Sequence, residues 1–347
     1  MAMNINNLVR PNIQKMVAYS SARHDFTGEA TTFLDANENP FDTGFNRYPD
    51  PLQHAVKAKL SKIKSVPAKN IFLGNGSDEA IDLLMRIFCR PQVDHILTLP
   101  PTYGMYKVSA AISDIENRMI PLTSDFQPKV EEILNAANAF SKLLFICSPN
   151  NPTGNDIELE RIEALIQGFK GIVVVDEAYI DFAGQPSCTQ FLEKYNNLVV
   201  LQTFSKAWGL AGIRLGMAFA SEEIIQLFNK VKPPYNVNQL TQEAALKALE
   251  NEAAQQSWVQ TIKMQRAWLA QQLTELNIVK KIHPTNANFI LAQFENPKKI
   301  YQYLVQQGII IRDRTNVLLC DDCLRITVGI EEENKFLIES LKNYIKD

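Results

Sequence analysis

The sequence predicts an α/β protein with a large domain, in which helices sandwich a mostly parallel seven-stranded sheet, and a smaller α+β domain. From residue 71 to residue 220, short β-rich apolar runs alternate with amphipathic helical stretches. This alternation is typical of parallel strands buried on both faces. After Ser221 the pattern changes to long helices and a short mixed tail. The 347 residues also exceed the roughly 250–300 that one core usually holds, which favours two unequal domains.

The composition is that of an ordinary globular protein, with 46% hydrophobic and 21% charged residues. It excludes disordered, collagenous and coiled-coil proteins. The formal net charge of −3 indicates no nucleic-acid partner. Apolar runs such as 143–147 are far shorter than the roughly 20 residues that span a bilayer, and the first residues contain no secretory signal. Five scattered cysteines favour a reducing compartment, so we expect a cytoplasmic protein without membrane association.

The large domain is expected to contain seven strands and the helices between them. The first helix is the clearest, because Ile81, Leu84, Met85 and Phe88 recur at helical spacing. The expected strands cover residues 71–73, 95–99, 118–122, 143–147, 172–175, 198–202 and 215–220, and the expected helices cover residues 77–89, 103–112, 128–138 and 158–169.

The second part of the chain is expected to be helical and then mixed. A helix opens at Ser221 and must end at Lys232-Pro233-Pro234. Helix resumes near residue 239, and a long helix from about 253 to 276, with Trp258, Ile262, Leu269 and Leu273 on one face, could bridge two domains. The tail predicts strands at 288–292, 309–312 and 324–328 and helices at 298–306 and 332–345. We therefore expect an N-terminal arm at 1–47 packing on the small domain, a large domain at 48–255 and a small domain at 256–347.

Lys206 follows directly after an apolar strand, where a lysine charge is costly away from water. A lysine in a solvent-facing loop is the usual interpretation. Its neighbours favour a binding site instead: Thr203 and Ser205 supply hydroxyls suited to a phosphate, and Arg214 can hold a phosphate with two hydrogen bonds. Three glycines would let the backbone approach a ligand closely: Gly209, Gly212 and Gly216.

Asp176 ends the β-branched run Val173–Val175, at the expected carboxyl edge of a parallel strand. Ligands of open α/β sheets bind at this edge. A helix N-cap is an equally good interpretation of the aspartate alone. A magnesium ligand of a nucleotide enzyme would need a P-loop motif, and the sequence contains none.

Two turns could also contact a ligand. The segment 74–79, GNGSDE, joins a strand to a helix start, so the backbone N–H groups of Ser77 and Asp78 could bind an anion. Glu79 stands where a dinucleotide fingerprint needs its third glycine, and a plain capped helix explains the segment as well. The rigid turn 148–154 could present the Asn151 amide to a ligand, although a turn needs no function.

Arg312 and Arg325 alternate with apolar residues on predicted strands. They either face solvent or bind an anionic substrate group. Cys320 and Cys323 form a lone CxxC, without a second pair or a nearby histidine in the sequence. We interpret this pair as structurally incidental, with redox or metal binding as the minor alternative, and we expect no metal.

Together these motifs resemble the fold-type I pyridoxal-phosphate-dependent aminotransferases. SPNNPTG at 148–154, DEAY at 176–179 and SKAWGLAGIRLG at 205–216 are specific to that superfamily in this order. LDANENP at 34–40, RYPDP at 47–51, PPYNVN at 233–238 and the two arginines narrow the resemblance, less decisively, to the histidinol-phosphate aminotransferase group. The resemblance extends from Tyr19 to Arg325, nearly the whole chain.

The resemblance implies pyridoxal 5′-phosphate as cofactor and assigns roles around it. Lys206 would form a Schiff base with the cofactor and then carry protons, Asp176 would pair with the pyridine nitrogen, and Tyr103 would stack on the ring. Tyr179 and Asn151 would hydrogen-bond the ring hydroxyl. The phosphate ligands would be Thr203, Ser205, Arg214 and the backbone of Ser77 and Asp78, joined by Tyr48 from the partner subunit of a homodimer. The substrate pocket would contain Tyr19, Asn37, Arg312 and Arg325.

The implied reaction moves the amino group of histidinol phosphate to 2-oxoglutarate and releases glutamate. Arginines can accept either a phosphate or a carboxylate, so one pocket could serve both substrates. Alternatives of the same fold are a threonine-phosphate decarboxylase and an aromatic-amino-acid aminotransferase. Alternatives outside enzymes are a cofactor-binding regulator and a binding protein without this cofactor. Cys147 stands where proline is frequent in relatives, and we expect no consequence because it precedes the ligand-facing turn.

Overall fold

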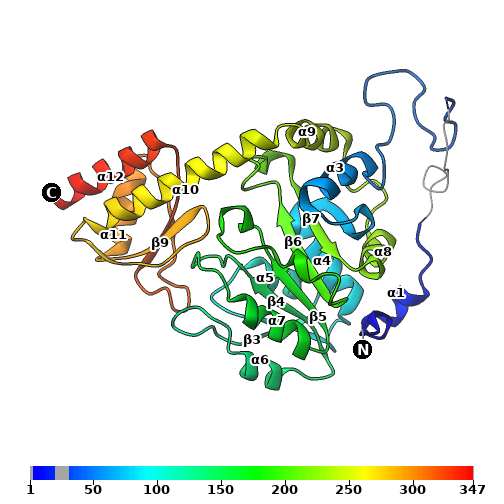
Figure 1. Cartoon of the computed structure of the whole chain (residues 1–347), viewed down its shortest axis with the longest axis horizontal. Helices are drawn as coiled ribbons and strands as arrows, with labels where there is room; N and C mark the ends of the chain where they lie inside the picture. The colour runs from blue at the N-terminus through cyan, green and yellow to red at the C-terminus, as the bar shows by residue number, and fades with distance from the viewer. Residues whose placement is uncertain (1–2, 20–30, 347) are drawn as a thin grey trace.

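The computed structural model describes residues 3–19 and 31–346, which contain two β-sheets connected by the long helix α10 (Glu252–Thr274) (Figure 1). The larger sheet has seven strands in the order β1-β7-β6-β5-β4-β2-β3. Their bounds are β1 Ile71–Asn75, β2 His95–Thr98, β3 Glu116–Met119, β4 Ser141–Cys147, β5 Ile172–Asp176, β6 Leu198–Thr203 and β7 Leu215–Ala220.

The large sheet is mostly parallel, as the sequence predicts. Strands β3, β2, β4, β5 and β6 are parallel neighbours, and β7 runs antiparallel to both β6 and β1. Parallel strands bring their carboxyl ends to one edge of a sheet. The α/β fold class is therefore confirmed, and Cys147, Asp176 and Thr203 end neighbouring strands at that edge.

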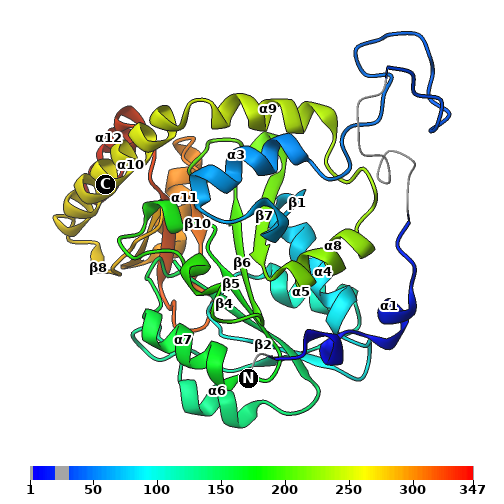
Figure 2. The ribbon, with the colours of Figure 1, turned by 45° about the vertical axis from the view of Figure 1, so that its right-hand side comes forward.

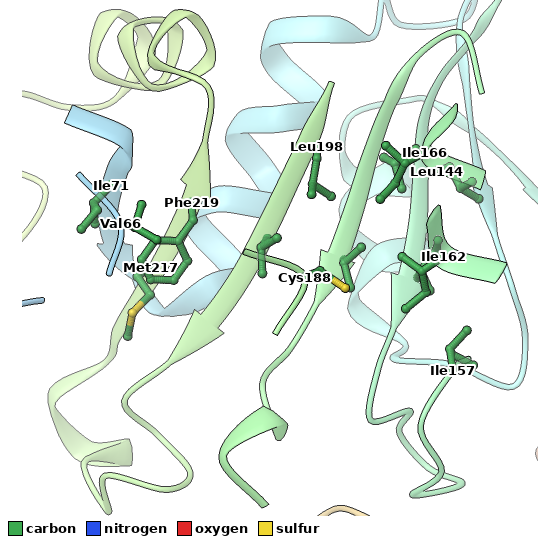
Figure 3. Close-up of a cluster of buried hydrophobic side chains, with 14 of the residues drawn as sticks. Val66, Ile71, Leu144, Ile157, Ile162, Ile166, Cys188, Leu198, Met217 and Phe219 are labelled. Carbon is green, nitrogen blue, oxygen red and sulfur yellow. The ribbon is translucent and has the colours of Figure 1, made fainter. Parts of the chain in front are cut away.

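Helices cover both faces of this sheet because alternate side chains of each strand point to opposite faces. Val173 and Val175 of β5 belong to one buried cluster, shown in Figure 3, whereas Ile172 and Val174 belong to the other. The first cluster is covered by α3 (His54–Lys64), α6 (Val130–Ala136), α7 (Leu159–Gly168) and α9 (Gln239–Leu249), and Figure 2 shows α3 beside α9. The second is covered by α1 (Pro11–Lys15), α4 (Gly76–Phe88), α5 (Met105–Ile112) and α8 (Glu222–Val231).

The smaller sheet is antiparallel, with the order β10-β11-β9-β8. One of its faces packs against the end of α10 and against two C-terminal helices, with Leu269, Ile290 and Leu324 in the shared core. The bounds are β8 Val279–Ile282, β9 Phe289–Phe294, α11 Pro297–Gln306, β10 Arg312–Asp313, β11 Cys323–Thr327 and α12 Glu331–Lys346. This arrangement is the expected α+β tail, with β8 added.

Several details differ from the sequence pattern, including β3, which covers 116–119 where residues 118–122 are predicted. Helix α3 is not predicted because its lysines mask its apolar stripe, and β8 is not predicted because its central lysines leave it partly exposed. Strand β10 is shorter than expected, since Ile310 is 74% exposed. The sequence pattern puts Trp258 on one face of α10 with Ile262, Leu269 and Leu273, but Trp258 is 53% exposed, because Val259 takes the inward position.

The N-terminal arm packs differently from the expectation for residues 1–47. Ile5, Val9 and Ile13 are buried in the core of the large domain, and the backbone N–H of Arg10 donates to Ile87 of α4 at 3.0 Å. Packing of this part on the small domain is therefore wrong, because its apolar side chains fill the α4–α8 layer. The expected boundary at 255/256 lies inside α10, so the domain limits stay a prediction.

No helix in the described ranges is long and apolar enough to cross a membrane. All five cysteines are buried and unpaired.

Candidate active site

A cavity of about 160 Å³ lies at the carboxyl edge of the large sheet. This position follows from the topology, because β4, β5 and β6 end there. Most of the cofactor residues that the sequence singles out lie around it. The lining residues are Gly76, Ser77, Asp78, Tyr103, Cys147, Asn151, Asp176, Ala178, Tyr179, Thr203, Ser205, Lys206, Ala211 and Arg214.

Asp176 is a buried carboxylate at the end of the central strand β5, with 2% of its surface exposed. The hydroxyl of Tyr106 donates to Oδ2 at 2.7 Å, and the backbone N–H of Ala178 donates to Oδ1 at 3.2 Å. Burial raises the pKa of Asp176 to about 6, and these two hydrogen bonds act against that increase. The carboxylate can therefore face a positively charged group in the cavity at neutral pH.

Lys206 lies on the turn after β6, with Nζ 5.7 Å from the centre of the Tyr179 ring. Its pKa is lowered, first by burial and then by the positive charges of Arg325 and Arg214. A lysine with a lowered pKa can supply a neutral amine, which is the form that acts as nucleophile or base.

The start of helix α4 and Arg214 form a cradle for an anion. The backbone N–H of Gly76 donates to the carbonyl of Arg214 at 2.8 Å, which joins the two segments. The Arg214 guanidinium donates to Ser205 Oγ at 3.4 Å and lies 3.7 Å from Asp78. A helix N-terminus beside an arginine is a strong site for a phosphate.

Gly216 permits this close approach between β7 and α4. A Cβ atom at Gly216 would lie 2.1 Å from the backbone nitrogen of Ser77. The hydroxyl of Thr203 is used within the neighbouring turn, because it accepts the Ser205 N–H at 3.1 Å and donates to the Leu215 carbonyl at 3.4 Å. Thr203 lines the cavity, and its role as a phosphate ligand stays a prediction.

Arg325 extends from the small sheet to Asn151, a residue of the cavity lining. Its guanidinium donates to the side-chain oxygen of Asn151, and Asn151 Nδ2 donates to the Tyr179 hydroxyl at 3.3 Å. The guanidinium also lies 5.1 Å from the centre of the Phe289 ring. Of the two alternatives for Arg325, a side chain that faces solvent is therefore wrong, and this side chain joins the two sheets at the site.

Arg312 lies directly opposite Arg325 in the β10–β11 pair. Directly opposed residues share one face of a sheet, so both arginines lie on the face that carries Arg325 to the cavity. Arg314, which the sequence reasoning missed, follows at the next alternate position, and its backbone N–H donates to the Cys323 carbonyl at 3.0 Å. Burial and the charges of Arg325 and Arg312 lower the pKa of Arg314 to about 10. The sequence offered one signal for Arg314: it lies two positions after Arg312, and alternate residues of a strand share one face.

Tyr106 and Cys147 are two further residues that sequence reasoning missed. Tyr106 lies three positions after Tyr103, so the two rings could have been expected near one another. Their centroids are 5.5 Å apart and edge-on, and the Tyr103 hydroxyl donates to Asp78 at 3.1 Å. Cys147, at the end of β4, also lines the cavity, and the expectation that cysteine in place of proline has no consequence there stays a prediction.

Five predicted site residues are absent from the lining of this cavity within the single chain: the two arginines of the small sheet lie beside it, and three residues lie elsewhere. Tyr19 lines a separate cavity with Pro51 and Lys230. Asn37 and Tyr48 line another, and the Tyr48 ring stacks on Tyr235 at 4.4 Å. Residues 31–49 contain no helix or strand and loop outward from the body (Figures 1 and 2), which keeps these side chains away from Lys206.

The CxxC pair is buried in the small domain beside Leu291. Cys323 Sγ lies 3.8 Å from His283 Nε2, so a histidine is nearby in space although not in sequence. Within residues 3–19 and 31–346, no group of three or more His, Cys, Asp or Glu side chains could hold a metal ion. The structurally incidental interpretation of the pair stays a prediction.

Comparison with known proteins points in the same direction as the geometry. Residues 32–341 match the model of the family "Aminotransferase class I and II". A histidinol-phosphate aminotransferase of Cytophaga hutchinsonii is 52% identical over 99% of this chain and 100% of its own length, and that of Christiangramia forsetii is 52% identical over 98% of this chain and 97% of its own.

Solved structures show the same fold. The histidinol-phosphate aminotransferase of Clostridium acetobutylicum has a TM-score of 0.80 and 25% identity over 87% of this chain and 92% of its own. The L-threonine-O-3-phosphate decarboxylase of Porphyromonas gingivalis has a TM-score of 0.73 and 22% identity over 87% of this chain and 91% of its own. The second likeness shows the fold alone.

We expect Gly216→Ala to disturb the anion cradle, because its Cβ would push the start of α4 outward. Overpacking of this kind lowers the free energy of unfolding by about 1–3 kcal/mol. Urea unfolding measures this loss, and titration with inorganic phosphate measures the accompanying loss of affinity. Gly212→Ala is the matched control, since its Cβ would meet no atom within 4 Å. Equal unfolding curves for the two variants would contradict the close approach.

Proposed function

The chain belongs to the class I and II aminotransferase family and is a pyridoxal-phosphate-dependent aminotransferase, and we propose that it transfers the amino group of L-histidinol phosphate to 2-oxoglutarate. The products would be imidazole-acetol phosphate and L-glutamate, in L-histidine biosynthesis. The observation that carries the substrate proposal is the set of arginines that the small sheet presents beside the Lys206 cavity. The names of the most similar relatives support it.

The residues around the cavity fit pyridoxal phosphate. The cradle at the start of α4, which the close approach of Gly216 to the backbone of Gly76 and Ser77 keeps in place, suits the phosphate. The buried carboxylate of Asp176 suits a protonated ring nitrogen, and Lys206 supplies the amine. Tyr103 lines the same cavity and can cover a ring face. When bound, this cofactor supplies an aldehyde for the amine and a ring that accepts electrons from the substrate carbon.

Each of these side chains then has one task. With the cofactor bound, Lys206 would take a proton from the substrate carbon and deliver it to the cofactor carbon on the other side of the transferred nitrogen, which its lowered pKa permits. Asp176 would stabilise positive charge on the ring nitrogen. Arg214, Ser205 and the backbone of Ser77 would anchor the phosphate, so that the reacting atoms stay within reach of Lys206.

The arginines support an anionic substrate. Histidinol phosphate carries a phosphate and no carboxylate, whereas 2-oxoglutarate and glutamate carry two carboxylates. A guanidinium accepts either anion with paired hydrogen bonds. We propose that Arg325 and Arg312, with Arg314 beside them, bind the phosphate of one substrate and the distal carboxylate of the other.

The decarboxylase and the aromatic aminotransferase use the same fold, and no contact in the described structure favours either. The products separate the reactions. A transaminase forms glutamate from 2-oxoglutarate, whereas a decarboxylase releases carbon dioxide from threonine phosphate and keeps the amine.

We also propose a homodimer in the cytoplasm, in which Tyr48 reaches the phosphate of the partner's cofactor. The outward position of residues 31–49 supports this, since Leu34 and Phe41 are 91% and 77% exposed in the single chain. Five unpaired cysteines support a reducing compartment.

The direct test incubates the purified protein with histidinol phosphate and 2-oxoglutarate and measures glutamate. We expect glutamate from the wild type, and Lys206→Ala should lower its turnover by about 10²–10⁴-fold because the proton carrier is lost. Lys170→Ala is the control, since Lys170 is an exposed lysine remote from the cavity lining. Carbon dioxide from threonine phosphate without glutamate, or full turnover by Lys206→Ala, would refute the proposal.

Arg325→Ala should weaken the binding of both substrates. A hydrogen bond to a charged group contributes about 1.5–3 kcal/mol, so kcat/KM should fall about 10–100-fold for histidinol phosphate and for 2-oxoglutarate. Arg118→Ala, which removes an exposed arginine that pairs with Glu116 at 2.9 Å, should change neither value. A loss for only one substrate would show that the two anions do not share this arginine.

Subunit mixing tests the role of Tyr48. We expect co-expressed Tyr48→Ala and Lys206→Ala chains to form hybrid dimers in which one of the two sites is intact, restoring about a quarter of the wild-type activity in a statistical mixture. Sedimentation checks that the dimers form. Activity no greater than the sum of the separate variants would place Tyr48 in its own subunit's site.

A further inference from the structure

Tyr106 makes the shortest side-chain contact with Asp176 and lies outside the cavity lining. Its hydroxyl donates to Oδ2 at 2.7 Å, while Oδ1 receives the Ala178 N–H at 3.2 Å. Each carboxylate oxygen therefore has one protein donor, and one donor is a side chain that could be lost. Tyr106 comes from α5, whereas Asp176 ends β5, so the contact joins a helix to the central strand.

We propose that Tyr106 is a positioning residue that keeps the carboxylate of Asp176 ionised and directed into the cavity. One part of the inference rests on the proposed function: the ionised carboxylate pairs with the protonated nitrogen of the cofactor ring.

The surroundings of Tyr106 hold its hydroxyl in place. The side chain has no exposed surface, and its ring stacks on Phe145 with centroids 4.6 Å apart and planes at 19°. The Tyr103 ring lies edge-on to it at 5.5 Å. A ring packed on two sides cannot swing its hydroxyl away from Asp176, so the hydrogen bond is built into the large-domain core.

The charges around Asp176 explain why this donor matters. Desolvation and the charge of Asp78 oppose ionisation of Asp176, whereas Lys206 favours it. The titratable groups that face the carboxylate are Tyr106 from α5, Cys147 at the end of β4, Asp78 on α4, Tyr103 before α5, Lys206 after β6 and Tyr179 after β5. Tyr106 keeps its proton throughout, since burial and the charge of Asp176 raise its pKa well above the ordinary value.

The pKa of Asp176 lies near 6, so a small loss of stabilisation brings it into the neutral range. Because it is raised from 3.8, the folded chain binds this proton more tightly than the unfolded chain. The contribution of this proton to the free energy of unfolding therefore disappears as pH rises from about 4 to about 6. Removal of the Tyr106 hydroxyl should extend that loss to higher pH.

The test compares full-length wild type with Tyr106→Phe, which keeps the ring and removes only the hydroxyl. Urea unfolding of the cofactor-free chain is measured from pH 5 to pH 8, together with the carboxyl ¹³C shift of Asp176. We expect the proton affinity of Asp176 to rise about tenfold, so that the destabilisation by Tyr106→Phe grows between pH 5 and pH 8. In an Asp176→Asn background this growth should vanish.

A hydroxyl that only fills space would give a destabilisation independent of pH in both backgrounds, and that result would overturn the inference. Tyr103→Phe is the matched control, because its hydroxyl contacts Asp78 and should leave the Asp176 titration in place. If Tyr106→Phe does not fold, Asp176→Asn gives the converse measurement. Loss of the carboxylate charge should lower the pKa of Tyr106, read from its ring ¹³C shift, and an unchanged value would refute the coupling.

Transamination is assayed separately on the cofactor-loaded proteins. A shifted Asp176 titration without any transamination by the wild type would refute the proposed function and leave the coupling of Tyr106 to Asp176 standing. Transamination by the wild type with an unchanged Asp176 titration in Tyr106→Phe would refute the coupling and leave the proposed function standing.

Discussion

Burying one carboxylate at the end of a central strand is the constraint on which the site depends. Asp176 has almost no contact with water, so its ionised form must be stabilised by the protein. The fold meets this need with a backbone N–H from Ala178 and a hydroxyl from Tyr106, supported by the positive charge of Lys206. Ala178 follows β5, Lys206 follows β6 and Tyr106 lies in the first turn of α5, so all three lie near the carboxyl edge of the parallel sheet, where the cavity lies.

The site belongs to both sheets. The large sheet and α4 supply the cradle and the carboxylate, whereas β11 of the small sheet supplies Arg325. Through Asn151, this arginine contacts the turn after β4. The charge of Arg325 also lowers the pKa of Lys206, and it does so more than the charge of Arg214. Recognition of an anionic substrate and activation of the lysine are thus coupled through one side chain, and both depend on how the two sheets face one another.

Much of this arrangement follows from local patterns. The β-branched run before Asp176, the hydroxyls around Lys206 and the glycine-rich start of α4 each indicate a ligand edge, because strand periodicity and turn chemistry are short-range properties. The packing of the N-terminal arm and the formation of α3 do not follow from local patterns. Both depend on burial against residues that are far away in the sequence. Ile5 and Ile13 carry no local signal that they fill the large-domain core.

The sequence by itself determined the α/β class, the strands of the large sheet and the residues that line the cavity from their ends. Only the tertiary structure decided that Tyr106 donates to Asp176 and that Arg325 turns inward to Asn151. The physical reason is that an α-helix or strand sets which face a side chain takes, whereas the partner on that face comes from packing between elements 70 or more residues apart, as the separations of 70 and 174 positions in these two contacts show.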